Sequence, residues 1–204
     1  MSKAFGERKV LEGFNLLIKP GDMVALWGVS GSGKTTLLNI MGLIEPIDSG
    51  NYDLFDHRNI TSGTRLARQA IRNEISYLFQ NFALVDDMTV EQNLRMGLYY
   101  VRISRDEQRR LIAQGLGAVG LEGYEKSLVY ELSGGEQQRV SLARSIIKPS
   151  RLLLADEPTG SVDIMNRDVV LEILKRMNKD GKTIIIATHD PFIANQCSHS
   201  VVLS

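Results

Sequence analysis

The chain has one cysteine, no excess of either charge and no long hydrophobic run. Cys197 alone cannot form an intramolecular disulfide, which argues against a disulfide-stapled secreted domain and suits a reducing compartment. Lys and Arg number 24 and so do Asp and Glu, so the basic excess typical of nucleic-acid-binding proteins is absent. The longest apolar runs, 23–27 and 183–188, are strand-sized and far shorter than the roughly 20 residues that span a bilayer. We therefore expect no nucleic-acid partner, and a membrane role would need a separate spanning partner.

Strand-like and helix-like segments alternate through much of the chain. Apolar or extended segments predict strands at 23–27, 50–55, 75–79, 152–155 and 183–188. Helices are expected at 34–42 and 168–179, the latter ended by Gly181. Such alternation predicts an α/β core with a parallel sheet and helices on both faces.

The middle of the chain has a different, mainly helical character. The expected helices are 89–100, 104–119 and 135–148, and Ser104 and Glu107 have capping-box spacing at the start of the second. We predict a helical insert at roughly 82–140 within a core formed by approximately 1–81 and 141–204, all belonging to one domain.

Residues 28–35 read Gly-Val-Ser-Gly-Ser-Gly-Lys-Thr and fit the phosphate-loop pattern GxxxxGK[ST]. Glycines let backbone N–H groups approach phosphate oxygens, and the N-terminus of the following helix favours an anion. Lys34 supplies a mobile charge for the outer phosphates, and the Thr35 hydroxyl can ligate Mg²⁺. An apolar strand before the loop and a helix after it argue against a chance glycine-rich turn. The expected nucleotide-binding residues are Gly28, Ser30, Gly31, Ser32, Gly33, Lys34, Thr35 and Thr36.

Two adjacent carboxylates, Asp156 and Glu157, follow the apolar strand 152–155. Ligands of open α/β sheets bind at the carboxyl ends of the strands. Asp156 can therefore hold Mg²⁺, and Glu157 can act as a general base on an attacking water. An acidic turn after a buried strand is common, so the pair alone is weak evidence for a metal or catalytic site. Together with the phosphate loop it is strong evidence.

A second glycine-containing helix start occurs at residues 132–139, Leu-Ser-Gly-Gly-Glu-Gln-Gln-Arg. Ser133, Gly134 and Gly135 at a helix N-terminus would form another anion site. One nucleotide does not need two such loops from one chain. The second loop becomes useful if it closes on a nucleotide held by another copy.

Residues 132–139 resemble the signature of ABC ATPases, and the resemblance covers essentially the whole chain. It implies that Gln80 corresponds to the Q-loop glutamine, a metal and water contact, and Asp163 to the D-loop aspartate, with Val162 where the family more often has Leu. It also implies that His189 corresponds to the H-loop histidine, which contacts the γ-phosphate. A lone histidine is more often structural, but His189 directly follows a buried strand.

The resemblance places Phe5 as the aromatic residue that stacks on adenine, with Val10 beside the nucleotide. Phe5 could equally fill a core. Related chains usually have a further strand before this region, so either the start is displaced or the small β subdomain lacks an edge strand. Adenine binding at Phe5 is then expected to be looser.

Within the family, residues 42–44, 79–81 and 132–140 look most like motors of the lipoprotein-releasing, macrolide-exporting and bacteriocin-exporting branch, and Tyr130-Glu131 resembles bacteriocin-export motors. The expected fold is a P-loop α/β core with an antiparallel β subdomain and an inserted helical subdomain. The resemblance implies an ATPase using ATP and Mg²⁺, an ATP-dependent homodimer and a transmembrane permease partner at the cytoplasmic face of the membrane.

Two other readings compete with this one. A single-cassette soluble ABC ATPase, such as one for iron–sulfur assembly, fits the same motifs, whereas the long insertions or second cassette of DNA-repair and ribosomal types are absent. A P-loop small-molecule kinase would not explain residues 133–136.

Overall fold

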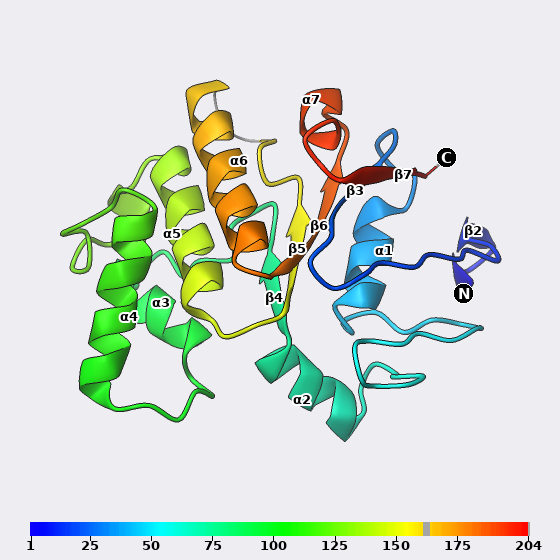
Figure 1. Ribbon diagram of the computed structural model, residues 1–204, viewed down its shortest axis with the longest axis horizontal. Coiled ribbons are helices and arrows are strands. Elements are labelled where there is room, and N and C mark those ends of the chain that lie inside the picture. The colour runs from blue at the N-terminus through cyan, green and yellow to red at the C-terminus, as the bar shows by residue number, and fades with distance from the viewer. Residues whose placement is uncertain (161–163, 204) are drawn as a thin grey trace. The chain divides into compact units, whose positions relative to one another are not determined.

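The chain forms two compact units in the computed structural model, which describes residues 1–160 and 164–203 (Figure 1). The first unit consists of Met1–Tyr77, Ser150–Glu157 and Gly181–Ser204. The second consists of Leu78–Pro149 and Pro158–Asp180. Each unit therefore draws on segments that are far apart in the sequence.

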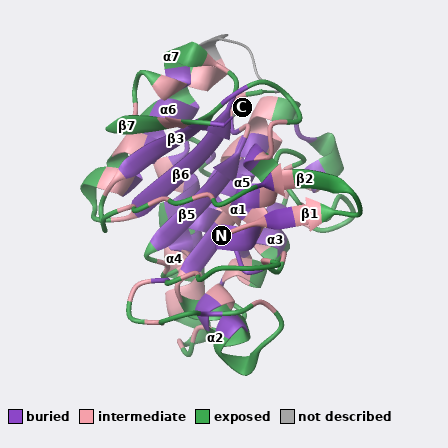
Figure 2. Ribbon diagram, turned by 90° about the vertical axis from the view of Figure 1, so that its right-hand side faces the viewer, coloured by how far each residue is buried: buried purple, intermediate pink, exposed green. Residues whose placement is uncertain are grey.

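A five-stranded sheet is the centre of the first unit, and its strands run in the order β4-β5-β6-β3-β7. β3 pairs in parallel with β6 and β7, and β5 pairs in parallel with β6. The continuous burial of the central strands explains why their sequences are apolar without alternation (Figure 2). The strands are β3 (Met23–Trp27), β4 (Ile75–Leu78), β5 (Leu152–Asp156), β6 (Thr183–Thr188) and β7 (His199–Val202).

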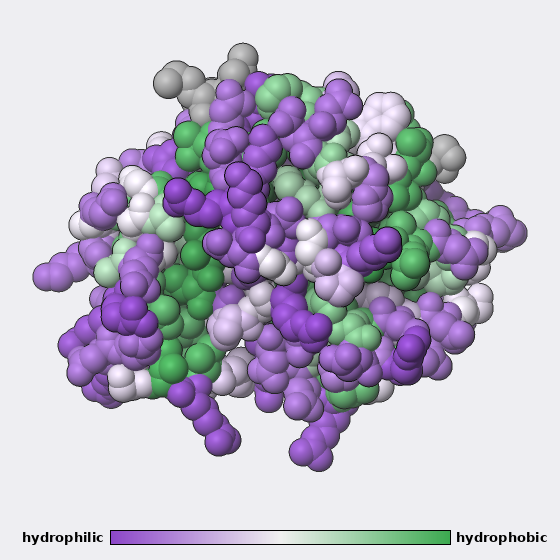
Figure 3. Space-filling model, viewed as in Figure 1, coloured by the Kyte–Doolittle hydropathy of each residue, from purple (hydrophilic) through white to green (hydrophobic). Residues whose placement is uncertain are grey.

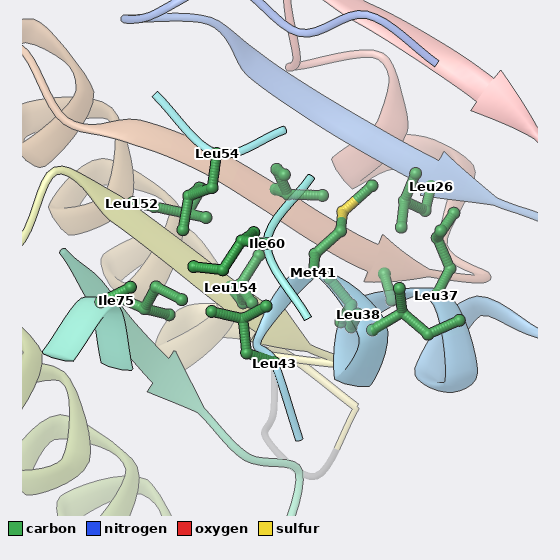
Figure 4. Packing of buried hydrophobic residues seen from close by; sticks show 14 of the residues in the cluster. Leu26, Leu37, Leu38, Met41, Leu43, Leu54, Ile60, Ile75, Leu152 and Leu154 are labelled. Atoms are coloured by element: carbon green, nitrogen blue, oxygen red, sulfur yellow. The ribbon is translucent and has the colours of Figure 1, made fainter. Parts of the chain in front are cut away.

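A short antiparallel hairpin and three helices complete the first unit. Leucines of α1 pack with Leu26 of β3 and Leu154 of β5, and Leu54 and Ile60 cover the same core (Figure 4). This packing fixes the start of α1 against the sheet. The hairpin strands are β1 (Lys3–Phe5) and β2 (Arg8–Leu11), and the helices are α1 (Lys34–Met41), α2 (Arg65–Asn73) and α7 (Pro191–Ala194).

The second unit is helical, and its helices begin at residues that suit an N-cap. Thr89, Ser104 and Ser133 each accept a hydrogen bond from a backbone N–H in the first turn of the helix that follows. α3 and α4 both pack against α5. The elements are α3 (Val90–Gly97), α4 (Arg105–Ala118), the short 3₁₀ helix η1 (Val129–Glu131), α5 (Gly134–Ile147) and α6 (Ile164–Lys179).

The fold class predicted from the sequence is confirmed, but some local predictions are wrong. Residues 50–55 form no strand, because Gly50 and Phe55 have positive φ and Leu54 pairs only with His57 in an isolated bridge. Helix α2 is not among the helices that the sequence predicts, because only Ala67 and Ala70 of its residues are buried. At α4 only half of the expected capping box forms, because Glu107 pairs with Arg110 instead of reaching back.

Among the described residues, no helix is both long enough and apolar enough to cross a membrane. The face shown in Figure 3 carries mostly hydrophilic side chains, with apolar residues visible between them.

The close approach of α4 to α5 depends on Gly115. A Cβ atom at this position would lie 2.5 Å from Ile147 Cγ2 and 3.4 Å from the Ala143 carbonyl oxygen. We expect Gly115→Ala to lower the free energy of unfolding by about 1–3 kcal/mol through overpacking, measured by urea denaturation. Gly117→Ala, in the same helix with its nearest neighbour at 3.5 Å, is the control and should raise stability by up to about 1 kcal/mol. Equal effects of the two changes would contradict this packing.

Candidate active site

Three loops of the first unit leave the sheet at the same edge, because β5, β6 and β3 are neighbouring parallel strands. Trp27 and Thr188 are paired in register, and Asp156 is paired one residue before Thr188. The segments that follow these strand ends are the phosphate loop and the residues Glu157 and His189. The sheet therefore brings together side chains that are more than 150 residues apart in the sequence.

The phosphate loop (residues 28–35) needs glycine at three positions. Gly31 has φ +81° and Gly33 has φ +93°, a region that other residues rarely adopt. At Gly28 a Cβ atom would lie 2.3 Å from the Leu203 carbonyl oxygen. Gly33 is the N-cap of α1 and offers no side-chain acceptor, so the first N–H groups of α1 remain available to an anion.

Of two buried polar groups of the phosphate loop, one has its partners within the loop and the other has none in the described part of the chain. Lys34 is only 7% exposed, and its Nζ donates to the carbonyl oxygens of Gly28 at 2.8 Å and Val29 at 3.0 Å. Ser32 Oγ is buried and has no hydrogen-bond partner within the described residues. A buried hydroxyl without a partner is costly, so the loop fits a bound polar group such as a phosphate.

Asp156 and Thr35 form an oxygen pair beside the phosphate loop. The Thr35 hydroxyl hydrogen-bonds to the Asp156 carboxylate, which ends β5 in a buried position. Burial raises the pKa of Asp156 and so does the charge of Glu157, while the bond from Thr35 and the charge of Lys34 act in the opposite direction. One carboxylate and one hydroxyl fit Mg²⁺, because this ion usually completes its coordination with several waters and with phosphate oxygens of the substrate. No cluster of three or more His, Cys, Asp or Glu side chains suited to a metal occurs in residues 1–160 and 164–203.

Glu157 and His189 contact each other across the strand ends. Glu157 Oε1 lies 2.9 Å from His189 Nδ1. Glu157 has φ +45°, an uncommon value for a residue other than glycine, and its N–H donates to the Ala187 carbonyl oxygen at 2.9 Å. The side chain of Glu157 is 14% exposed and that of His189 is 66% exposed. A shielded carboxylate oriented by a more accessible imidazole is an arrangement that can position a water.

The β1–β2 hairpin carries Phe5, expected to stack on the base, and Val10, expected beside the nucleotide. Phe5 is 50% exposed, and Lys3 Nζ lies 4.9 Å from its ring centroid. Val10 faces the phosphate loop, since its Cγ1 lies 2.8 Å from where a Cβ of Gly33 would be. A cleft of about 360 Å³ beside the hairpin is lined by, among others, Val10, Phe14 and Ser32. Phe5 thus offers an accessible ring, and its role toward adenine stays a prediction.

Gln80 is exposed in a turn of the second unit whose backbone is held by α5. The two residues Phe82 and Ala83 have φ values of +62° and +48°. Arg144 donates to both of their carbonyl oxygens, at 2.8 and 2.6 Å, and Ser141 Oγ donates to that of Phe82 at 3.0 Å. The segment after Gln80 is therefore tied to the helix that starts at the signature.

The signature residues form a complete helix cap in the second unit. Ser133 and Glu136 make a capping box in which the Ser133 N–H donates to Glu136 Oε2 at 2.8 Å. Gly134 has no atom within 4 Å of an added Cβ, whereas Gly135 lies against the Asn166 side chain. Ser133 and Gly134 are exposed, so the start of α5 is accessible. Asp163, expected to bind nucleotide, lies outside the described residues.

The sequence model described as "ABC transporter" matches residues 11–160. This chain belongs to the ABC transporter family. The chain is 39% identical, over all of its length, to the macrolide export ATP-binding/permease protein MacB of Escherichia coli, but it spans about a third (32%) of that relative. It is 37% identical, over 97% of its length and 86% of the relative, to YvrO of Bacillus subtilis, an ABC transporter ATP-binding protein without a characterised function.

Solved structures of ABC cassettes have the same fold. The dimeric structure of MJ0796, a bacterial ABC transporter cassette, superposes with a TM-score of 0.90 at 31% identity and covers 99% of this chain and 90% of that one. A dimeric post-hydrolysis state of MJ0796 bound to ADP and phosphate has a TM-score of 0.87 at 31% identity and covers 100% of this chain and 90% of that one. The family and this second neighbour support ATPase activity for the chain.

Sequence reasoning missed two arginines of this ABC cassette that touch the site segments. Arg144 binds the carbonyl groups after Gln80, and Arg8 donates to the Gly31 carbonyl oxygen at 3.0 Å. In both cases the acceptor is a backbone carbonyl oxygen, which every residue has, so the amino-acid sequence does not show which residue each arginine contacts. Only the spacing of Arg8 and Val10, two residues apart on one strand, could have indicated a shared face toward the phosphate loop.

Proposed function

We propose that this chain is the ATP-hydrolysing motor of an ABC transporter that exports its substrate through a separate membrane permease. The observation that carries the proposal is the convergence of the phosphate loop, Asp156, Glu157 and His189 at one edge of the sheet. A loop that binds phosphates beside a shielded carboxylate suits nucleoside triphosphate hydrolysis.

In the proposed reaction the phosphate loop and the N-terminus of α1 bind the phosphates, with Lys34 on the outer ones. Thr35 and Asp156, together with Gln80, would hold Mg²⁺, which neutralises charge on the phosphates when bound. Glu157 accepts the proton of a water that attacks the γ-phosphorus, while the bond to the bridging oxygen breaks and ADP leaves. His189, held at 2.9 Å by Glu157, would hydrogen-bond to a γ-phosphate oxygen.

The proposed active form is a homodimer with two nucleotides. The signature residues Ser133, Gly134 and Gly135 of one copy would close on the ATP held by the other, with Asp163 at the same interface. The accessible start of α5 supports this role, since within the described residues the capping box leaves the N–H groups of Gly134 and Gly135 without a capping partner and these can favour an anion. The dimeric MJ0796 structures are in keeping with such an assembly.

The proposed partner is a permease subunit that docks on residues 81–87, next to Gln80. Relatives named MacB join an ATP-binding part and a permease in one longer chain, of which this chain matches about a third. The macrolide export for which these relatives are named supports an export role here, and the cargo would be a peptide such as a bacteriocin or a lipoprotein. The subunit would then work at the cytoplasmic face of the membrane.

Changing Lys34→Ala tests the nucleotide site itself. Loss of a buried, charged donor to phosphate typically costs about 1.5–3 kcal/mol, so the Kd for ATP should rise about 10- to 100-fold and turnover should fall with it. Isothermal titration with Mg·ATP and a phosphate-release assay measure both. Lys19→Ala, an exposed lysine, is the control and should change neither. Unchanged affinity and hydrolysis in Lys34→Ala would refute the phosphate-loop assignment.

A further inference from the structure

Strand β2 runs alongside the phosphate loop and presents alternate side chains to it. Arg8 Nη2 donates to the Gly31 carbonyl oxygen at 3.0 Å, and two residues later Val10 packs against Gly33. Lys9 lies between these two residues and is among those that line the cleft beside the hairpin. Its Nζ pairs with Glu12 at 2.6 Å. Of these two neighbouring cations, Arg8 hydrogen-bonds to the loop, whereas Lys9 is paired with Glu12.

The guanidinium of Arg8 is exposed, and no carboxylate in residues 1–160 and 164–203 pairs with it. Within the described residues, the Gly31 carbonyl oxygen is the one hydrogen-bond partner recorded for its side chain. A guanidinium has five N–H donors, so the remaining donors face the mouth of the loop or solvent. Its planar fork matches the oxygens of a phosphate better than an ammonium does.

We infer that Arg8 is a second phosphate-binding cation of this site, acting on the phosphate chain of the nucleotide from the β2 side of the loop. The inference rests on the proposed ATP-binding function. Lys34 lies within the loop at the start of α1, whereas Arg8 reaches Gly31 from the hairpin that also carries Phe5. The hairpin thereby recognises the phosphates as well as presenting a ring for the base.

The competing role for Arg8 is a brace, a hydrogen bond that merely holds the Gly31 backbone in place. The two roles differ in their salt dependence. Attraction between an exposed cation and phosphates is screened as the Debye length falls from roughly 14 Å at about 50 mM salt to roughly 4 Å at about 500 mM. A hydrogen bond to a neutral carbonyl is not screened in this way.

The test compares Arg8→Gln with Lys9→Gln, which removes the same charge from the neighbouring residue, a lysine already paired with Glu12. The probes are Mg·ATP and Mg·tripolyphosphate, which has no base or sugar, in competition with a fluorescent ATP analogue. For Arg8→Gln we expect Kd to rise about tenfold for both probes at low salt and about twofold at high salt. For Lys9→Gln we expect less than a twofold change.

The inference would be overturned by no effect of Arg8→Gln, by an effect equal to that of Lys9→Gln, or by a loss that does not depend on salt. A loss for ATP but not for tripolyphosphate would equally exclude a phosphate contact and indicate a role toward the base. Lys34→Ala in the same assay separates this inference from the proposed function. If Lys34→Ala loses binding and Arg8→Gln does not, only the role of Arg8 fails; if neither loses binding, the nucleotide site itself fails.

Discussion

Replacing Glu157 by Gln is expected to lower ATP turnover by at least about a hundredfold while ATP still binds. General-base catalysis is typically worth about 10²–10⁴ in rate, and an amide has the shape of the carboxylate without its basicity. Glutamine, like glutamate, would have to adopt the positive φ of +45° at this position, so the backbone cost does not change. Its amide can still contact His189 Nδ1. The loss should therefore appear in kcat, measured by phosphate release, and not in the Kd for ATP.

The matched control for this change is Glu172→Gln, the same chemistry on an exposed side chain of α6 that pairs with Lys175. It should leave kcat unchanged. A fall of less than about threefold in Glu157→Gln would mean that another group positions the water, and His189 would be the first to examine because it lies 2.9 Å from Glu157.

The edge of the sheet could be predicted from the sequence because the determinants are local. Apolar runs fix β3, β5 and β6 as buried parallel strands, and parallel strands end at one edge. The polar residues that follow each run, such as Lys34, Asp156 and His189, then come together without further information. The hydrogen bond between Thr35 and Asp156 follows from the same geometry.

Features that depend on turns and on backbone acceptors could not be predicted in this way. Residues 50–55 contain strand-forming side chains, but Gly50 and Phe55 take positive φ, and Asp53 accepts from the Asn59 N–H to close a turn instead. Arg8 and Arg144 look like ordinary surface cations in the sequence, because the carbonyl groups that they bind leave no mark in it.

In the proposed transporter, the transport direction and the cargo do not depend on the nucleotide site of this chain. The residues proposed to bind and hydrolyse ATP lie in this chain, whereas the proposed permease would select the substrate. Relatives named MacB are ATP-binding/permease proteins, and this chain spans about a third of their length.

A charge placed in the signature loop is expected to have the second large effect, a loss of ATP-dependent dimerisation. In Glu157→Gln, ATP is bound but not hydrolysed, so the closed homodimer should accumulate. Adding Gly134→Asp places a carboxylate at the start of α5, where the γ-phosphate held by the other copy would lie. At about 4 Å and an effective dielectric constant near 20, this repulsion is on the order of 4 kcal/mol per charge pair, which weakens dimerisation about a thousandfold.

Gly134 is the better position for this test than its neighbour. An added Cβ at Gly134 meets no atom within 4 Å, whereas at Gly135 it would press on the Asn166 side chain, which also binds Arg139. Gly134→Asn, in which the new side chain is nearly isosteric with Asp but uncharged, is the control for side-chain bulk.

The measurement is light scattering of the variants with ATP at equal protein concentrations. Glu157→Gln alone should be a dimer. With Gly134→Asp added, the protein should be a monomer that still binds ATP, and with Gly134→Asn added it should be mainly a dimer. Equal dimerisation of the Asp and Asn variants would contradict a contact between the signature and the partner's nucleotide, because the charge alone distinguishes them. A monomeric Glu157→Gln protein in saturating ATP would contradict the ATP-dependent homodimer for the isolated chain.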